Sequence, residues 1–135
     1  MDIDFAFLAD TAQESGGKLH ALGIGIDTLV AAEIPVSQAA LAAVVQVRYP
    51  VAETGTKTLA IRVVDADGGN VIEPIDSQVS FPAPQGVPAG TMRVIIALNS
   101  LTFPRYGDYA IQIALDGHDV ASLRLAVVPP PVAPA

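Results

Sequence analysis

The chain has 135 residues and contains no cysteine, no tryptophan and only seven aromatic side chains, four Phe and three Tyr. The absence of cysteine excludes disulfide bonds, thiolate metal ligands and a cysteine nucleophile together. The apolar half of the sequence consists mainly of Ala, Val, Leu and Ile. Side chains of this size favour a core between two closely packed sheets over a large cofactor cavity, and we expect no cofactor.

Basic residues are also scarce, with seven Lys and Arg against fourteen Asp and Glu, a net charge of −7. The few bases are scattered along the chain and form no stripe that could neutralise nucleic-acid phosphates. For the same reason the sequence has no polybasic patch for an anionic membrane surface. We therefore expect neither a nucleic-acid partner nor a membrane partner.

Long hydrophobic runs are missing as well. The longest, residues 39–47, is interrupted by Gln46 and falls well short of the ~20 residues that span a bilayer. The first residues, M-D-I-D, carry acids where a secretory signal would carry bases. These features predict a cytoplasmic protein.

What the sequence does contain is alternation of apolar and polar residues with a period of two, the pattern of half-buried strands. Residues 109–115 and 121–127 are the clearest case, because Asp116-Gly117 between them suits the positive φ angles of a two-residue type I′ turn. Residues 71–81 contain Pro74, which cannot donate to a ladder, so they predict an edge strand or an interrupted one. The other candidate strands are 3–10, 18–26, 45–49, 58–63 and 91–98.

Short strands at regular spacing without a helical period indicate an all-β sandwich. Pro104 and Gly107 break the chain before Tyr109, and a Gly-x-Tyr at such a crossing is similar to the tyrosine corner of immunoglobulin-like sandwiches. We predict a single-domain immunoglobulin-like β-sandwich of seven to eight antiparallel strands over residues 1–128. Tyr109 should be buried, with its hydroxyl bonded to backbone a few residues upstream. The proline-rich tail, 129–135, should be disordered.

Two segments resemble a family of small uncharacterised bacterial proteins. Residues 4–27 read D-F-A-F-L-A-D-T-A-Q-E-S-G-G-K-L-H-A-L-G-I-G-I-D, and residues 101–117 read L-x-F-P-x-x-G-D-Y-A-I-Q-I-A-L-D-G. The family is defined as a domain of unknown function. The resemblance therefore implies no catalytic residue, cofactor or partner.

One loop has the residue types of a calcium site. Asp65, Asp67 and Asn70 place oxygen ligands near one another, as calcium loops do. However, Gly68 falls at the fourth position, whereas the EF-hand spacing requires glycine at the sixth and glutamate at the twelfth. The sequence favours a hairpin turn that binds no calcium.

A polar cluster is the second candidate site. His20 with Asp10 and Asp27 could bind a metal ion or serve as catalytic groups if the three side chains converged. More simply, His20 is a half-buried residue bonded to backbone and His118 is a solvated turn residue. Since no nucleophile elbow and no phosphate loop occurs, we expect a non-catalytic binding or structural module. The alternative is an enzyme or a metal-dependent small-ligand binder.

An apolar sheet face is the third candidate. In immunoglobulin-like order, residues 3–10, 18–26 and 91–98 would share a sheet, with Leu22 and Ile24 facing inward. The outward positions would be apolar, and such patches mark interaction surfaces. We expect a protein partner or a homodimer there, which Ile95→Arg should break, unless loop 82–90 covers the face. The predicted interaction surface consists of Leu8, Leu19, Ala21, Ile95 and Ala97.

Overall fold

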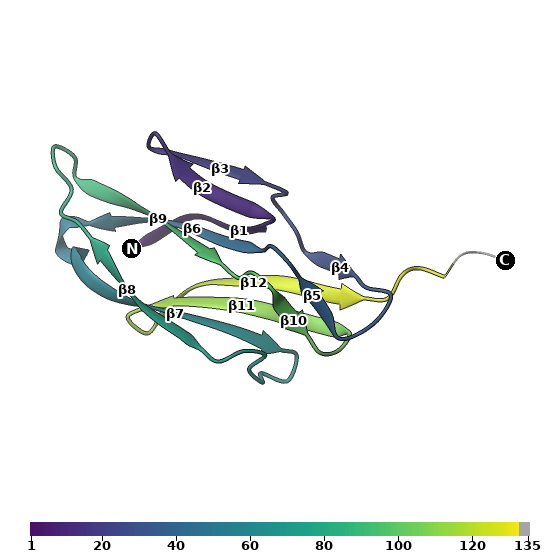
Figure 1. Cartoon of the computed structure of the whole chain (residues 1–135). Coiled ribbons are helices and arrows are strands. Elements are labelled where there is room, and N and C mark those ends of the chain that lie inside the picture. The colour runs from purple at the N-terminus through teal and green to yellow at the C-terminus, as the bar shows by residue number, and fades with distance from the viewer. Residues whose placement is uncertain (133–135) are drawn as a thin grey trace.

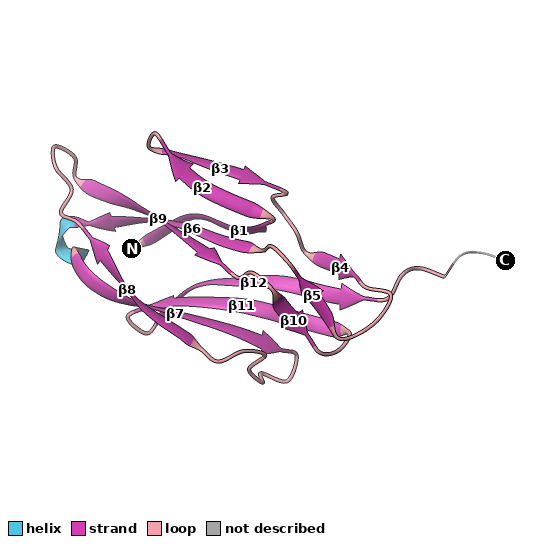
Figure 2. Ribbon diagram, viewed as in Figure 1, coloured by secondary structure: helices cyan, strands magenta, loops and turns pink. Residues whose placement is uncertain are grey.

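The computed structural model describes residues 1–132 and is built almost entirely of strands (Figures 1 and 2). The all-β prediction is confirmed. Within this range there is one short 3-10 helix, η1 (Val51–Glu53), and no helix long and apolar enough to cross a membrane. The strands are β1 (Asp2–Ala9), β2 (Thr11–Ser15), β3 (Lys18–Leu22), β4 (Thr28–Val30), β5 (Val36–Gln38), β6 (Ala42–Pro50), β7 (Gly55–Asp65), β8 (Ile75–Phe81), β9 (Ala89–Ala97), β10 (Leu101–Phe103), β11 (Gly107–Leu115) and β12 (His118–Val128).

Two sheets form the layers of a sandwich (Figure 1). One has the order β1-β6-β9, and the other has the order β4-β12-β11-β7-β8. All neighbours are antiparallel except β4, which runs parallel to β12. The short β5–β10 ladder continues the β6–β9 ladder, because the amide of Leu98 donates to the carbonyl of Leu41 between them.

The core between the sheets holds inward side chains of both layers, such as Val45 and Ile96 facing Ile61, Ile111 and Leu125. Alternation places these residues on one face of each strand. The structure contains more strands than the sequence predicts, because β2, β4, β5 and β10 have only three to five residues. Such short elements carry too little periodicity to be recognised.

The C-terminal hairpin confirms two predictions. Asp116 and Gly117 form its two-residue loop with φ angles of 49° and 80°, as a type I′ turn requires. The hydroxyl of Tyr109 donates to the carbonyl of Arg105 at 2.6 Å, and its ring is buried in the core. This bond ties the start of β11 to the chain four residues upstream.

The predicted facing of β1 is wrong. Ala6 and Leu8 pack on the core, and Leu8 is only 3% exposed, whereas Phe5 and Phe7 face away from it. The register with β6 shifts between Ile3 and Phe5. A bulge of this kind inserts one residue and reverses the faces that follow it.

The predicted place of residues 18–26 is also wrong. They do not join the β1-β6-β9 sheet; β2 and β3 form a hairpin that lies over its outer face (Figure 1). The hairpin turns at Gly16 and Gly17, whose φ angles of 61° and 73° suit a two-residue loop.

The burial of Val44 shows that the hairpin covers part of the outer face of the β1-β6-β9 sheet. Val44 alternates with the core residues Ala43 and Val45 and pairs with Ile95, so it faces away from the core. It is nevertheless 0% exposed, and it lies outside the core cluster. The start of β6 is therefore covered on both faces, which explains why this strand begins with an unbroken apolar run.

The chain ends beyond the sandwich. Residues 129–132 follow β12 as an exposed segment without secondary structure. The rest of the predicted tail, 133–135, lies outside the described residues.

Candidate functional site

The segment between the β2–β3 hairpin and β5 exposes large apolar side chains. Leu22, Ile24, Val30 and Ile34 are between 40% and 70% exposed. These four lie within residues 22–34, and the remaining exposed large apolar side chains of the described chain are scattered over the other elements. We call this stretch the 22–34 segment.

The local backbone explains why these side chains face solvent. β3 ends at Leu22, and Gly23 and Gly25 follow with φ angles of 69° and 91°, a region that favours glycine. A side chain at position 23 would also collide with the carboxylate of Asp10. Within β3, Leu19 and Ala21 are half-buried, whereas His20 and Leu22 are exposed. The left-handed turns that follow leave Ile24 exposed as well. The predicted inward facing of Leu22 and Ile24 is therefore wrong.

The second half of the segment is held by β12. β4 pairs in parallel with β12, with Leu29 packed on the core and Val30 on the opposite side of the strand. Ile26 also packs on the core. Alternate side chains thus anchor the segment, and the others remain exposed.

An open hollow of about 570 Å³ adjoins this segment along the hairpin. Leu22 belongs to both the 22–34 segment and the hollow. Two half-buried residues of the predicted interaction surface, Leu19 and Ala21, also line the hollow. The other lining residues are Thr11, Gln13 and His20.

The other three residues of the predicted interaction surface lie in different environments. Leu8 faces the core. Ile95 lies half-buried on the outer face of β9, which the hairpin overlies, and Ala97 is exposed at the end of that strand. Residues 82–88 connect β8 to β9, and residues 89 and 90 of the predicted loop belong to β9. The outer face is contacted by β2 of the hairpin.

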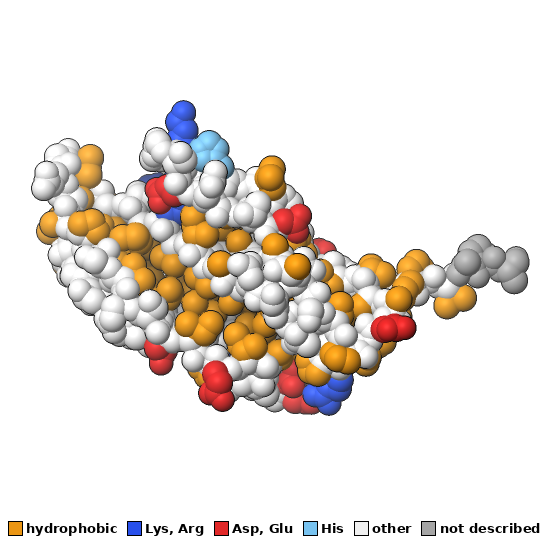
Figure 3. All heavy atoms as spheres, viewed as in Figure 1, with side chains coloured by type: hydrophobic (Ala, Val, Ile, Leu, Met, Phe, Trp, Pro, Cys, Tyr) orange, Lys and Arg blue, Asp and Glu red, His pale blue; other side chains and the backbone are white. Residues whose placement is uncertain are grey.

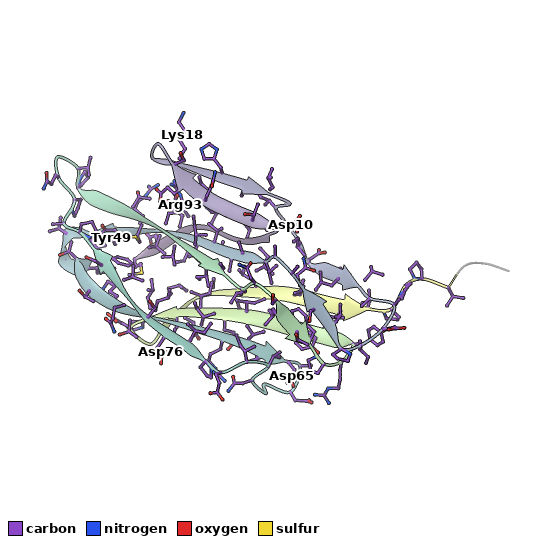
Figure 4. The ribbon with its side chains drawn as sticks, in the orientation of Figure 1. Asp10, Lys18, Tyr49, Asp65, Asp76 and Arg93 are labelled. Carbon is purple, nitrogen blue, oxygen red and sulfur yellow. The ribbon has the colours of Figure 1, made fainter. Side chains whose placement is uncertain are left out.

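The predicted polar cluster does not assemble into a metal site. Within residues 1–132 no group of three or more His, Cys, Asp or Glu side chains could hold a metal ion. His20 is exposed on β3 instead of half-buried, while Asp10 sits where β1 turns into the hairpin (Figure 4). Asp27 accepts a hydrogen bond from the neighbouring hydroxyl of Thr28 and precedes β4.

The carboxylate of Asp65 already accepts hydrogen bonds from backbone amides of its own loop. Oδ1 of Asp65 accepts hydrogen bonds from the amides of Asp67 at 3.0 Å and Gly69 at 2.9 Å. Its Oδ2 lies 3.4 Å from the guanidinium of Arg105. These contacts use the carboxylate to close a hairpin loop, as the sequence favours.

A second hollow, of about 510 Å³, lies at the end of the five-stranded sheet. It brings together Lys57, Asp116 and His118, which the sequence analysis does not connect. Nζ of Lys57 lies 3.7 Å from Asp116, whose other oxygen accepts the amide of Thr58 at 2.8 Å. These charges neutralise one another and stabilise the β11–β12 turn.

Comparison with models of protein families gives one match, to a family described as "Family of unknown function (DUF6941)", over residues 4–128. No curated protein matches the sequence.

Proposed function

The chain belongs to this family of unknown function, and we propose that it is a non-catalytic module that acts by binding another protein through the 22–34 segment. The observation that carries this proposal is the concentration of Leu22, Ile24, Val30 and Ile34 in one exposed stretch. Scattered apolar side chains need no explanation on a protein surface, whereas grouped ones mark interaction sites.

The free energy of association indicates how large the contact with a partner protein must be. Full burial of a Leu, Ile or Val side chain is worth roughly 1.5–3 kcal/mol, and association costs about 4–15 kcal/mol in lost freedom. Four such side chains therefore only balance that cost. The adjoining hollow, which shares Leu22 with the segment, supplies further contact area.

We also propose that the sandwich is immunoglobulin-like and that the protein is cytoplasmic. The sheet β1-β6-β9 corresponds to strands A, B and E of an immunoglobulin domain, and the facing order β12-β11-β7-β8 corresponds to its strands G, F, C and C′. Tyr109 lies at the start of β11, the strand equivalent to F. The hairpin and β4 are then additions between the first two strands. The lack of cysteine supports the location.

Site-specific photo-crosslinking in the native cell tests the binding surface. A benzophenone amino acid is placed at Ile24, at Val30 or at Ser122. Ser122 is exposed on β12, and it lies several residues along that strand from Val128, the pairing partner of Val30. We expect the same cross-linked protein from positions 24 and 30 and none from position 122. No product from positions 24 and 30, or the same product from all three positions, would contradict the proposal.

A further inference from the structure

One side of the sandwich is open, between the edge strands β8 and β9. Figure 3 shows apolar side chains gathered in the middle of this face, between the two strands located in Figure 1. Ile75 is 38% exposed, and Val79 and Met92 are half-buried although all three face inward. We call these three side chains the open strip.

β8 is the longest unpaired edge of the five-stranded sheet. Within the described chain it pairs only with β7, while the other edge strand of that sheet, β4, has three residues. An edge presents free backbone N–H and C=O groups that can bind another strand. Proteins usually block such edges with lysine, proline, a bulge or a covering loop.

Within its length β8 carries a single charged side chain, Asp76, and no lysine, proline or bulge. Its sequence, I-D-S-Q-V-S-F, contains no Lys and no Pro, and its register with β7 is unbroken. Pro74 and Pro82 flank it directly. Because proline cannot donate to a ladder, they limit any added strand to residues 75–81, whose midpoint is Gln78.

We propose that β8 binds β8 of a second copy of this chain, antiparallel and centred on Gln78, so that the two five-stranded sheets join into one. This inference goes beyond the proposed function, because it uses a different surface from the 22–34 segment. β-strand addition of this type takes its affinity from main-chain hydrogen bonds and its specificity from alternate side chains.

The register suits a twofold symmetric pair. Asp76, the one charged residue of β8 (Figure 4), would lie opposite Ser80 of the second copy and away from its own equivalent. Ile75 would lie opposite Phe81, and Ser77 opposite Val79. In this register no like charges lie directly opposite each other. Directly opposed like charges would destabilise the ladder.

The open strip provides the apolar part of the contact. A seven-residue ladder alone falls short of the roughly 1,200–2,000 Å² that a stable interface buries. Two residues of the open strip, Ile75 and Val79, lie on β8 itself, so joining the β8 strands of two copies brings the two strips together. A second copy is therefore a better occupant than a polar peptide.

Purified full-length protein tests this by sedimentation velocity over a micromolar to millimolar concentration series. We expect a monomer–dimer equilibrium that Gln78→Lys weakens by about fivefold or more, because two like charges then face each other across the twofold axis. Gln78→Glu alone should act in the same way. A mixture of the two variants should form a dimer again, because opposite charges then meet.

Ser122→Lys is the matched control, since Ser122 is exposed on the same sheet away from β8, and it should leave the dimer unchanged. A second measurement uses the absence of native cysteine. Gln78→Cys should form a disulfide-linked dimer under mild oxidation, because directly opposite Cβ atoms lie about 4.5–5.5 Å apart, and Ser122→Cys should not.

A monomer at every concentration would overturn the inference. So would a dimer that Gln78→Lys and the charge mixture leave unchanged, since its interface would lie elsewhere. Either result leaves the cross-linking prediction for positions 24 and 30 intact, so that the two proposals fail separately.

Discussion

The guanidinium of Arg93 donates a hydrogen bond to the carboxylate of Glu14 at 2.9 Å, and this ion pair joins the β2–β3 hairpin to β9 (Figure 4). Nε of the same guanidinium donates to the side chain of Gln46 on β6 at 3.0 Å. Arg93 thus connects the covering hairpin to two strands of the sheet beneath it. The hairpin is part of the folded sandwich, and the surface under it is an internal contact.

We predict that Val44→Asp lowers the free energy of unfolding by more than about 3 kcal/mol, because it buries an unpaired charge under the hairpin. Urea denaturation measures the effect. Ser122→Asp is the control on an exposed outer face and should stay within about 0.5 kcal/mol of the wild type. Equal effects of the two variants would mean that the hairpin does not cover the sheet.

Tyr109→Phe should lower the free energy of unfolding by about 0.5–1.5 kcal/mol, the net contribution of one hydrogen bond, since the carbonyl of Arg105 loses its donor. The change appears as a lower denaturation midpoint. Tyr106→Phe removes a bond to the carbonyl of Ala31 from a more exposed ring and should cost less. An unchanged midpoint for Tyr109→Phe would count against the corner.

Gly117→Val should destabilise the protein by roughly 1–2 kcal/mol, because a β-branched residue is strained at a φ of 80°. Gly117→Asn should cost clearly less, since Asn tolerates this left-handed conformation. Thermal unfolding of both variants measures the difference. If the two melt at the same temperature, strain at this turn does not contribute to stability.

We predict that calcium does not stabilise the protein. Titration calorimetry at millimolar calcium should detect no saturable heat from the 65–70 loop, because Oδ1 of Asp65 already accepts two backbone amides. Asp65→Ala should instead lower stability by about 1–2 kcal/mol with or without calcium, as loss of a loop-closing carboxylate does. Binding heat that disappears in Asp65→Ala would contradict the turn interpretation.

Local signals in the sequence predicted the elements whose geometry is decided within a few residues. Asp116-Gly117 specified its own hairpin because few dipeptides accept two positive φ angles. The period-two pattern of residues 109–115 specified both the strand and its buried face. Pro74 indicated that residues 71–81 form an edge strand or an interrupted one, since proline cannot donate to a ladder. β8 begins directly after Pro74 and lies at the edge of its sheet.

The candidate binding site was not predictable in the same way. The alternation of residues 18–26 suggested that Leu22 and Ile24 face inward, whereas both are exposed. Gly16 and Gly17 indicate a turn, but nothing local indicates that the resulting hairpin lies over another sheet. Nor does the sequence indicate that the segment then passes to the opposite layer through β4. The grouping of exposed apolar side chains in residues 22–34 is visible only once burial is known.

The sequence by itself determined most of the longer strands, the turn at Asp116-Gly117 and that the fold is all-β, because these depend on backbone conformation and neighbour alternation. Only the tertiary structure decided which face of β1 and of residues 18–26 is buried. A single bulge in β1 reversed the facing of Leu8, and a strand with apolar residues on both faces carries no periodic signal for orientation. The layer above Val44 comes from residues more than twenty positions away, so packing between distant segments set the surface of this protein.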